Sequence, residues 1–293
     1  MQSLRKQESD VLQTATLGIA LPALVAGSWW VISWQLWRRA NTVPVTGQWG
    51  GPLAVATGYA AGHCLLDGFP AYPPVSIQQA LFYLALGLAA FALFEPFWGR
   101  KGRHRCFTRV VVCAIFALGI LRTPVRDTWT AWEGRIGISA LVAAAVLLWA
   151  ATEALALRRP GTAVPLSLWF ATACASVCMA LAGSAFLGQL TGALAATLGA
   201  AAVLAWWAPR VSLAQGGVTL WVPLYSGLMY QAHFHSGLPL LAAICLYAAP
   251  LAPWLLEGID TVRWTPWKVV GARVACLAVP VALALAQSIF AAS

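Results

Sequence analysis

The sequence predicts an all-α fold: a polytopic transmembrane helical bundle of about ten spans, with no sizeable soluble domain. Of the 293 residues, 60% are hydrophobic and 9% are charged, whereas soluble domains carry about 25% charged residues. Apolar runs of about 20 residues, long enough for a helix to cross a bilayer, recur along the chain. We therefore expect lipid, rather than water, to surround most of a single domain formed by residues 1–293.

The first half of the chain contains five predicted spans. The first ends at Arg38-Arg39 without a small-residue cleavage site, so we expect it to be retained and not removed as a signal peptide. The second is the least apolar, because it contains His63 and Asp67. The charged and aromatic connection over residues 122–135 is expected to lie along the membrane surface. The five spans cover residues 14–37, 50–67, 76–97, 106–122 and 136–157.

The second half of the chain contains five more predicted spans. The division between the eighth and ninth, at Ser236-Gly237, is weakly marked, so counts of nine or eleven crossings stay open. Prolines inside predicted spans should kink or interrupt their helices, and they occur at Pro22, Pro223, Pro253 and Pro280. The five spans cover residues 165–187, 190–208, 217–235, 238–256 and 267–290.

Two pairs of glycines predict close contacts between helices. Gly58 and Gly62, like Gly188 and Gly192, are separated by three residues. This spacing puts both members of a pair on one helix face, where the missing side chains let a neighbouring backbone approach. We expect both faces to pack inside the bundle, with a dimer interface as the alternative.

The net charge of +9 does not indicate nucleic-acid binding. The positions of the basic residues instead predict how the protein is oriented in the membrane. A nucleic-acid-binding module needs a folded basic face, and no connection here is long enough to build one. Lys and Arg are enriched in the cytoplasmic loops of membrane proteins, so we expect the cell inner (cytoplasmic) membrane with both termini outside. Most of the 18 basic residues then lie inside: Arg38, Arg39, Arg100, Lys101, Arg103, Arg105, Arg109, Arg158, Arg159, Arg210, Arg263, Lys268 and Arg273.

The sequence contains no motif that identifies a reaction or a cofactor. A P-loop, H-E-x-x-H, G-x-S-x-G and the dinucleotide-binding glycine motif are all absent. The seven cysteines fall in or beside apolar runs without a C-x-x-C, so we expect small, buried apolar side chains. They do not indicate a redox compartment.

Two acidic residues near the inner ends of predicted spans are candidates for charge pairing. Glu95 precedes the basic cluster over residues 100–109, and Glu153 precedes Arg158 by five residues. We expect ion pairs with arginines at the membrane interface. A proton or cation relay is the alternative, and it needs a second acid or base at the same depth.

Three of the four histidines form a candidate divalent-metal site with one carboxylate. His63 and Asp67 are four residues apart, on one helix face, while His233 and His235 end the eighth predicted span. Imidazole and carboxylate groups are zinc ligands. The alternatives are a simple His63–Asp67 pair with interfacial His233 and His235, or a proton-linked transport site.

Several short glycine- and proline-containing stretches resemble a family of uncharacterised bacterial multi-span membrane proteins. The resemblance implies the membrane class and carries no activity. The residues that carry it are Trp49-Gly50-Gly51, Gly62-His63, Pro73-Pro74, Gly183-Ser184-Ala185 and Gly188-Gln189-Leu190-Thr191-Gly192.

Three functional hypotheses follow from the sequence. The first is an accessory or structural subunit that packs against membrane-protein partners, or against itself, among membrane lipids. The second is a permease for a small solute or ion, indicated by many spans and interrupted helices. The third is a membrane-embedded, metal-dependent enzyme acting on lipid-linked substrates through His63, Asp67, His233 and His235.

Overall fold

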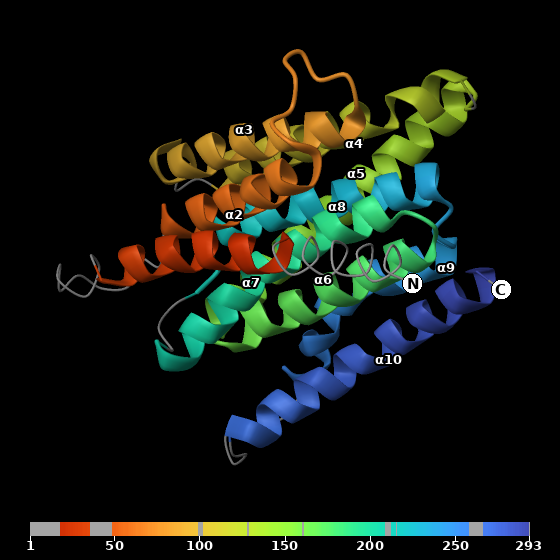
Figure 1. The fold of residues 1–293 in the computed structure, drawn as a ribbon. Coiled ribbons are helices and arrows are strands. Elements are labelled where there is room, and N and C mark those ends of the chain that lie inside the picture. Colours follow the sequence, from red (N-terminus) through yellow and green to blue (C-terminus); the bar gives the residue numbers. More distant parts are fainter. Residues whose placement is uncertain are drawn as a thin grey trace, which may run out of the picture.

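The computed structural model describes residues 18–35, 49–98, 102–127, 129–159, 161–208, 212–214, 216–257 and 266–292. These residues form helices joined by short turns and contain no β-strand, so the all-α prediction is confirmed for them. Figure 1 shows the helices packed side by side as a bundle.

The helices correspond closely to the apolar runs of the sequence. A first helix covers residues 18–35, inside the first predicted span. The others are α2 (Gly50–Asp67), α3 (Ile77–Trp98), α4 (Gly102–Asp127), α5 (Ala131–Arg158), α6 (Ala163–Leu181), α7 (Ala185–Trp207), α8 (Gly217–Ser236), α9 (Leu240–Ala248), the 3-10 helix η1 (Ala249–Leu256) and α10 (Pro266–Ala292).

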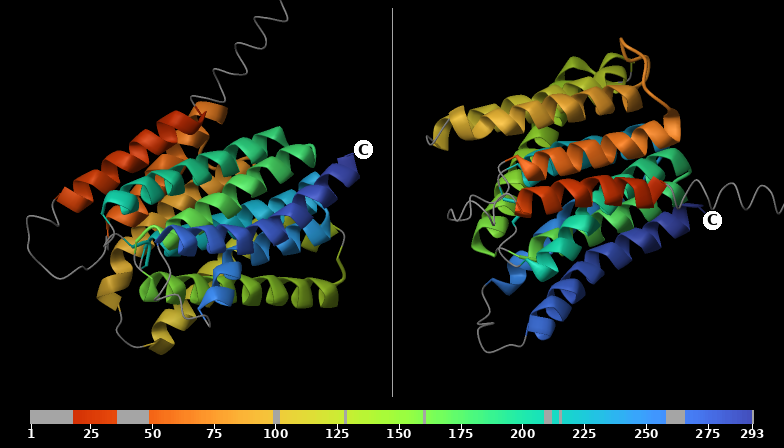
Figure 2. Two further views of the ribbon diagram at one scale, coloured as in Figure 1. Left: turned by 90° about the horizontal axis from the view of Figure 1, so that it is seen from below. Right: turned by 60° about the vertical axis from the view of Figure 1, so that its left-hand side comes forward.

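Helix α8 occupies the centre of the bundle. It contacts α2, α3, α4, α5, α6, α7 and α9, and all of its residues from Gly217 to Ala232 are buried. Helices α3 and α10 lie on opposite edges, as the two further views in Figure 2 also show. The polar side chains of α8 between Thr219 and Gln231 therefore face protein and not the surroundings of the bundle.

Five of the described helices are long and apolar enough to cross a membrane. This supports an integral membrane protein but does not confirm ten spans. Helix α8 is not among the five, because it carries polar side chains, and Leu240–Leu256 is too short. The five are Ile77–Glu95 within α3, Ala131–Arg158, Ala163–Leu181, Ala185–Trp207 and Gly271–Ala291 within α10.

The predicted boundary between the sixth and seventh spans is wrong. Helix α6 ends at Leu181, because Gly183 adopts a φ of 91° that L side chains rarely tolerate. Ser184 then caps α7, its hydroxyl oxygen accepting a hydrogen bond from the Leu187 N–H. The apolar run continues through this turn, so hydropathy alone placed the break too late.

The expected connection over residues 122–135 is wrong in extent, since α4 continues to Asp127 and α5 begins at Ala131. That this segment lies along the membrane surface stays a prediction. Thr130 and Glu133 form a capping box that starts α5 earlier than its apolar run. The prediction that Pro253 interrupts its helix is confirmed: within the ninth predicted span, α9 gives way at Ala249 to the 3-10 helix η1, which contains Pro250 and Pro253.

The glycine pairs pack helices inside the bundle. A Cβ atom on Gly58 would lie 2.4 Å from Thr197 Cγ2, and one on Gly62 would lie 2.5 Å from the Ala193 Cβ, both on α7. A Cβ atom on Gly188 would lie 2.9 Å from the backbone oxygen of Ser176 on α6. The internal-packing prediction is therefore confirmed for these glycines, which let α2 and α6 approach α7 closely.

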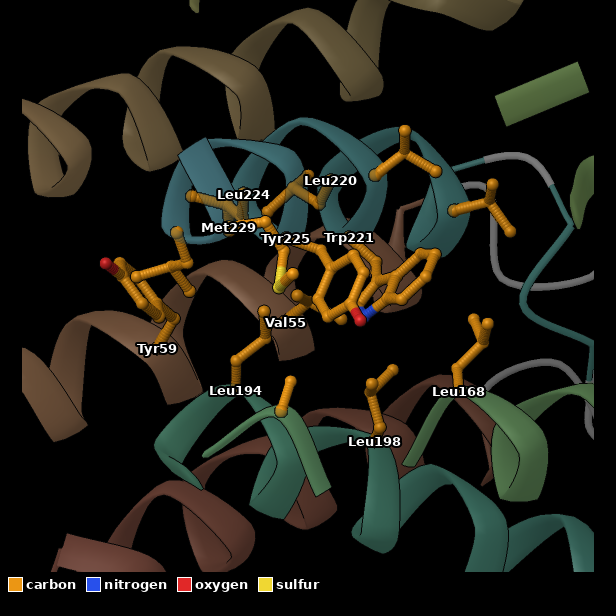
Figure 3. Packing of buried hydrophobic residues seen from close by; sticks show 14 of the residues in the cluster. Val55, Tyr59, Leu168, Leu194, Leu198, Leu220, Trp221, Leu224, Tyr225 and Met229 are labelled. Carbon is orange, nitrogen blue, oxygen red and sulfur yellow. The ribbon is translucent and has the colours of Figure 1, made fainter. Parts of the chain in front are cut away.

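Large side chains fill the space between α8 and its neighbours. Trp221 and Tyr225 stack with ring centroids 4.7 Å apart, and Figure 3 shows both rings directed from α8 toward Leu194 and Leu198. The Trp221 indole N–H donates a hydrogen bond to Thr172 Oγ1 at 3.0 Å. This side of α8 is therefore a packed core, and the Tyr225 hydroxyl adds a hydrogen bond to the Leu246 carbonyl of α9 at 2.8 Å.

Candidate functional site

A polar stripe runs along α8. It consists of Thr219, Ser226, Tyr230 and His233, which follow one another at intervals of seven, four and three residues. Because a helix turns once every 3.6 residues, this spacing puts all four on one side. Each forms a hydrogen bond with a group outside α8.

The first end of the stripe meets a buried ionic cluster. Its members are Glu95 from α3, Arg105 and Arg109 from α4, and Glu153 from α5. Arg105 lies 3.5 Å from Glu95 Oε1 and 2.9 Å from Glu153 Oε1. Arg109 Nη2 bonds Glu153 Oε2 and lies 3.8 Å from Glu95 Oε1. The Thr219 hydroxyl donates to Glu95 Oε2 at 3.0 Å.

The ionic cluster holds α3, α4 and α5 together, and the Thr219 hydrogen bond to Glu95 adds α8. Its two carboxylates and two guanidinium groups balance in charge, and both glutamates are buried. The Arg109 guanidinium also lies 5.2 Å from the centroid of the Trp149 ring, a cation–π contact. The predicted pairing of Glu95 and Glu153 with arginines is thus confirmed, although within the protein. Glu95 and Glu153 contact the same two arginines and so lie at one depth, as a proton or cation relay would need. Each carboxylate is nevertheless paired with arginine, which is typical of a structural clamp.

A second ionic group lies at the same end of the bundle. Glu257, which follows η1, pairs with Arg159 at 3.1 Å and with Arg273 of α10 at 3.7 Å. We call this end, where α3, α5 and η1 finish and α4 and α10 begin, the basic end. Ion pairs therefore tie the helices together at the basic end.

Tyrosine hydroxyls provide the polar contacts in the middle of the stripe. Ser226 Oγ lies 2.7 Å from the Tyr247 hydroxyl of α9. The Tyr230 hydroxyl donates a hydrogen bond to the Leu141 carbonyl of α5 at 2.7 Å. The rings of Tyr230 and Tyr247 stack with centroids 6.3 Å apart. These bonds fix α5 and α9 on either side of α8.

A crevice of about 410 Å³ opens between α5 and α9, with α8 as its floor. Three of its rim side chains, Leu147, Leu240 and Ile244, are 68%, 59% and 55% exposed, so the crevice is open to the surroundings of the bundle. Its lining is almost wholly apolar and comprises Leu141, Ala144, Leu147, Leu148, Met229, Tyr230, His233, Phe234, Leu240, Ala243, Ile244, Tyr247, Ala248 and Leu251.

His233 supplies a polar atom at one end of this crevice. Its Nδ1 lies 2.7 Å from the Leu238 carbonyl oxygen, which can only accept, so Nδ1 carries the proton and donates. The ring also packs edge-on against Phe234 at 4.7 Å. The crevice thus combines apolar walls with a single imidazole near the end of α8, away from the basic end.

The four residues of the predicted metal site are not gathered into one group. His63 is fully buried among the rings of Phe82 and Phe186, and its Nε2 donates to the Gln78 carbonyl at 3.2 Å. Asp67 and His235 are exposed. In the part of the chain that the structure describes, no cluster of three or more His, Cys, Asp or Glu side chains is arranged to hold a metal ion.

Comparison with protein-family models, with curated proteins and with solved structures finds no match for this chain. The resemblance to multi-span membrane proteins carried by the glycine and proline stretches therefore stays a prediction.

The polar stripe and its partner Tyr247 were not predicted from the sequence. The available signal was the spacing of Thr219, Ser226, Tyr230 and His233, which repeats on one side of an otherwise apolar run. A polar stripe in a membrane-embedded helix predicts a helix that faces protein. The spacing does not reveal Tyr247, since its position depends on how α9 packs.

Proposed function

We propose that this integral membrane protein takes an amphiphile from the bilayer into the crevice between α5, α8 and α9. The observation that carries the proposal is the contrast within the crevice: apolar walls along its length and one imidazole, His233, at one end. A molecule with an apolar chain and a polar head is complementary to that contrast.

The size and access of the crevice support the same occupant. A volume of about 410 Å³ lies within the range of about 300–1,000 Å³ typical of small-molecule sites. The exposed rim residues Leu147 and Ile244 belong to the apolar surface that a bilayer would cover. A lipid chain can therefore enter sideways without passing through water.

Filling the crevice should abolish binding. Ala144, on the crevice wall of α5, is replaced by tryptophan, whose ring occupies the space of a chain. We expect crosslinking of a hexadecyl diazirine probe to residues of α8 and α9 to fall at least tenfold, measured by mass spectrometry of the purified protein in lipid nanodiscs.

Ala150→Trp is the matched control. Ala150 is exposed on the same helix and does not line the crevice, so labelling of α8 and α9 should stay unchanged. Equal labelling of the original protein and Ala144→Trp at these helices would show that the probe reports surrounding lipid, and the proposal would be wrong.

The accessory-subunit role is the second candidate, favoured by a separate apolar groove of about 1,000 Å³. The groove lies between residues 18–35, α6 and α7, and its floor includes Ala196, Gly199 and Ala200. Small residues of this kind let a helix of a second copy approach closely. A dimeric mass in mild detergent that Ala200→Trp reduces to the monomer is the expected result, and a monomeric mass in lipid nanodiscs and in detergent would contradict it.

The remaining sequence-based roles have less support. A permease is suggested by the interrupted element α9–η1, which in our proposal forms a wall of the crevice. Metal-dependent chemistry at His63, Asp67, His233 and His235 has no geometric support among the described residues.

We further propose that the basic end faces the cytoplasm, with the termini on the outer side of the inner membrane. Arg105, Arg109, Arg159 and Arg273 lie at this end, and the positive-inside rule supports the assignment. In a cysteine-free background, an impermeant maleimide added to whole cells should label Ala185→Cys at the opposite end and not Lys268→Cys. The reverse pattern would contradict this orientation.

A further inference from the structure

The hydrogen-bonding state of His233 determines what it offers to a ligand. Since Nδ1–H donates to the Leu238 carbonyl, the neutral ring keeps its lone pair on Nε2. Nε2 lies across the ring from Nδ1, and His233 lines the crevice. No hydrogen bond to Nε2 is found among the described residues. His233 therefore offers an acceptor at the end of an apolar crevice.

The other polar side chains of the crevice have their hydrogens committed. The Tyr230 hydroxyl donates to the Leu141 carbonyl. Tyr247 and Ser226 are hydrogen-bonded to each other at 2.7 Å, and the Tyr247 oxygen lies 3.5 Å from that of Tyr230. With Ser226 donating to Tyr247 and Tyr247 donating to Tyr230, each hydroxyl hydrogen has an acceptor within the protein. The crevice has an acceptor to offer and no free donor.

We infer that the ligand of this crevice is a single-chain amphiphile with a hydroxyl head group, which donates its hydrogen bond to His233 Nε2. This inference rests on the proposed function and specifies its ligand class. The chain then lies along Ile244 and Ala248 toward Leu251, at the far end of the apolar wall.

Head groups that only accept hydrogen bonds do not fit this arrangement, and a charged ammonium group finds no carboxylate among the described residues of the lining. A carboxylate or an ester oxygen only accepts hydrogen bonds, and it would face the Nε2 lone pair with no donor to bind. Burying such an acceptor without a partner is unfavourable. An ether oxygen is the closest comparison to a hydroxyl, because it lacks only the donated hydrogen.

Competition among three ligands with the same chain tests the inference. 1-Hexadecanol, its methyl ether and hexadecanoate compete with the hexadecyl diazirine probe for the crevice of the purified protein in nanodiscs. One additional hydrogen bond changes affinity by roughly fivefold to tenfold. We expect the alcohol to displace the probe at a concentration lower by that factor than either of the other two.

Two variants of His233 separate the role of the Nε2 acceptor from that of the hydrogen bond between Nδ1 and the Leu238 carbonyl. In His233→Asn the amide nitrogen occupies the place of Nδ1 and can still donate to Leu238, but the Nε2 acceptor is lost. In His233→Gln the amide oxygen can take the place of Nε2. The preference for the alcohol should disappear in His233→Asn and be partly restored in His233→Gln.

The outcomes distinguish this inference from the proposed function. Equal competition by alcohol and ether in the original protein, or stronger competition by hexadecanoate, overturns the hydroxyl assignment while the crevice still binds a chain. An alcohol preference that persists in His233→Asn also overturns the role of Nε2. Failure of every ligand to displace the probe overturns the proposed function itself.

Discussion

Replacing Arg109 with leucine is expected to lower the free energy of unfolding by about 3–5 kcal/mol. Arg109 bonds Glu153, lies 3.8 Å from Glu95 and packs over Trp149. Its removal leaves two buried carboxylates with Arg105 as their remaining partner in the cluster, and uncompensated buried charge is unfavourable. Thermal unfolding in detergent, followed by tryptophan fluorescence, measures the loss.

A double substitution provides the control for this prediction. In Arg109→Leu combined with Glu153→Leu, the remaining charges are Glu95 and Arg105, which lie 3.5 Å apart. Because charge balance is restored, the double variant should be more stable than Arg109→Leu alone. Additive losses would contradict the interpretation of the ionic cluster as a charge-balanced clamp.

Replacing Trp221 with alanine should cost about 3 kcal/mol, the lower end of the range for truncating a buried aromatic side chain. Trp221 is fully buried, stacks on Tyr225 and donates to Thr172. Within a bilayer the substitution mainly removes dispersion contacts and does not lose transfer free energy from water. The loss of stability is therefore expected at the lower end of that range. The same thermal measurement reports it.

Trp207→Ala is the matched control for Trp221→Ala. Trp207 ends α7 and is 76% exposed, so its truncation removes few contacts and should change stability by less than about 0.5 kcal/mol. Trp221→Phe should give an intermediate loss, since it keeps a ring but removes the N–H that donates to Thr172. Similar effects of Trp207→Ala and Trp221→Ala would contradict a packed centre around α8.

Most of the helices could be predicted from the sequence because a helix in lipid must satisfy its own backbone hydrogen bonds. A run of apolar residues of sufficient length therefore predicts a helix without knowledge of its neighbours. The second and eighth predicted spans, residues 50–67 and 217–235, agree with α2 and α8 within one residue. The predicted helix boundaries were wrong where a capping residue or a positive φ ends a helix inside an apolar run, as at Gly183.

The candidate site could be predicted only in part. The spacing of Thr219, Ser226, Tyr230 and His233 carries a recoverable signal, and the pairing of Glu95 and Glu153 with arginines was expected. That both glutamates share the same two arginines could not be foreseen. It depends on α3, α4 and α5 meeting at one end of the bundle, with Glu153 brought into contact with arginines 44 and 48 positions earlier in the chain.

The sequence by itself determined the helical class, the approximate extent of most helices, and a surface suited to lipid, because local hydropathy and backbone hydrogen bonding are properties of short segments. Only the tertiary structure decided that α8 is enclosed by protein, that His63 and His233 have separate surroundings, and that α5 and α9 leave a crevice between them. These features depend on how distant segments pack, and apolar helices in lipid offer many nearly equivalent neighbours until small residues, ion pairs and buried hydroxyls select one arrangement.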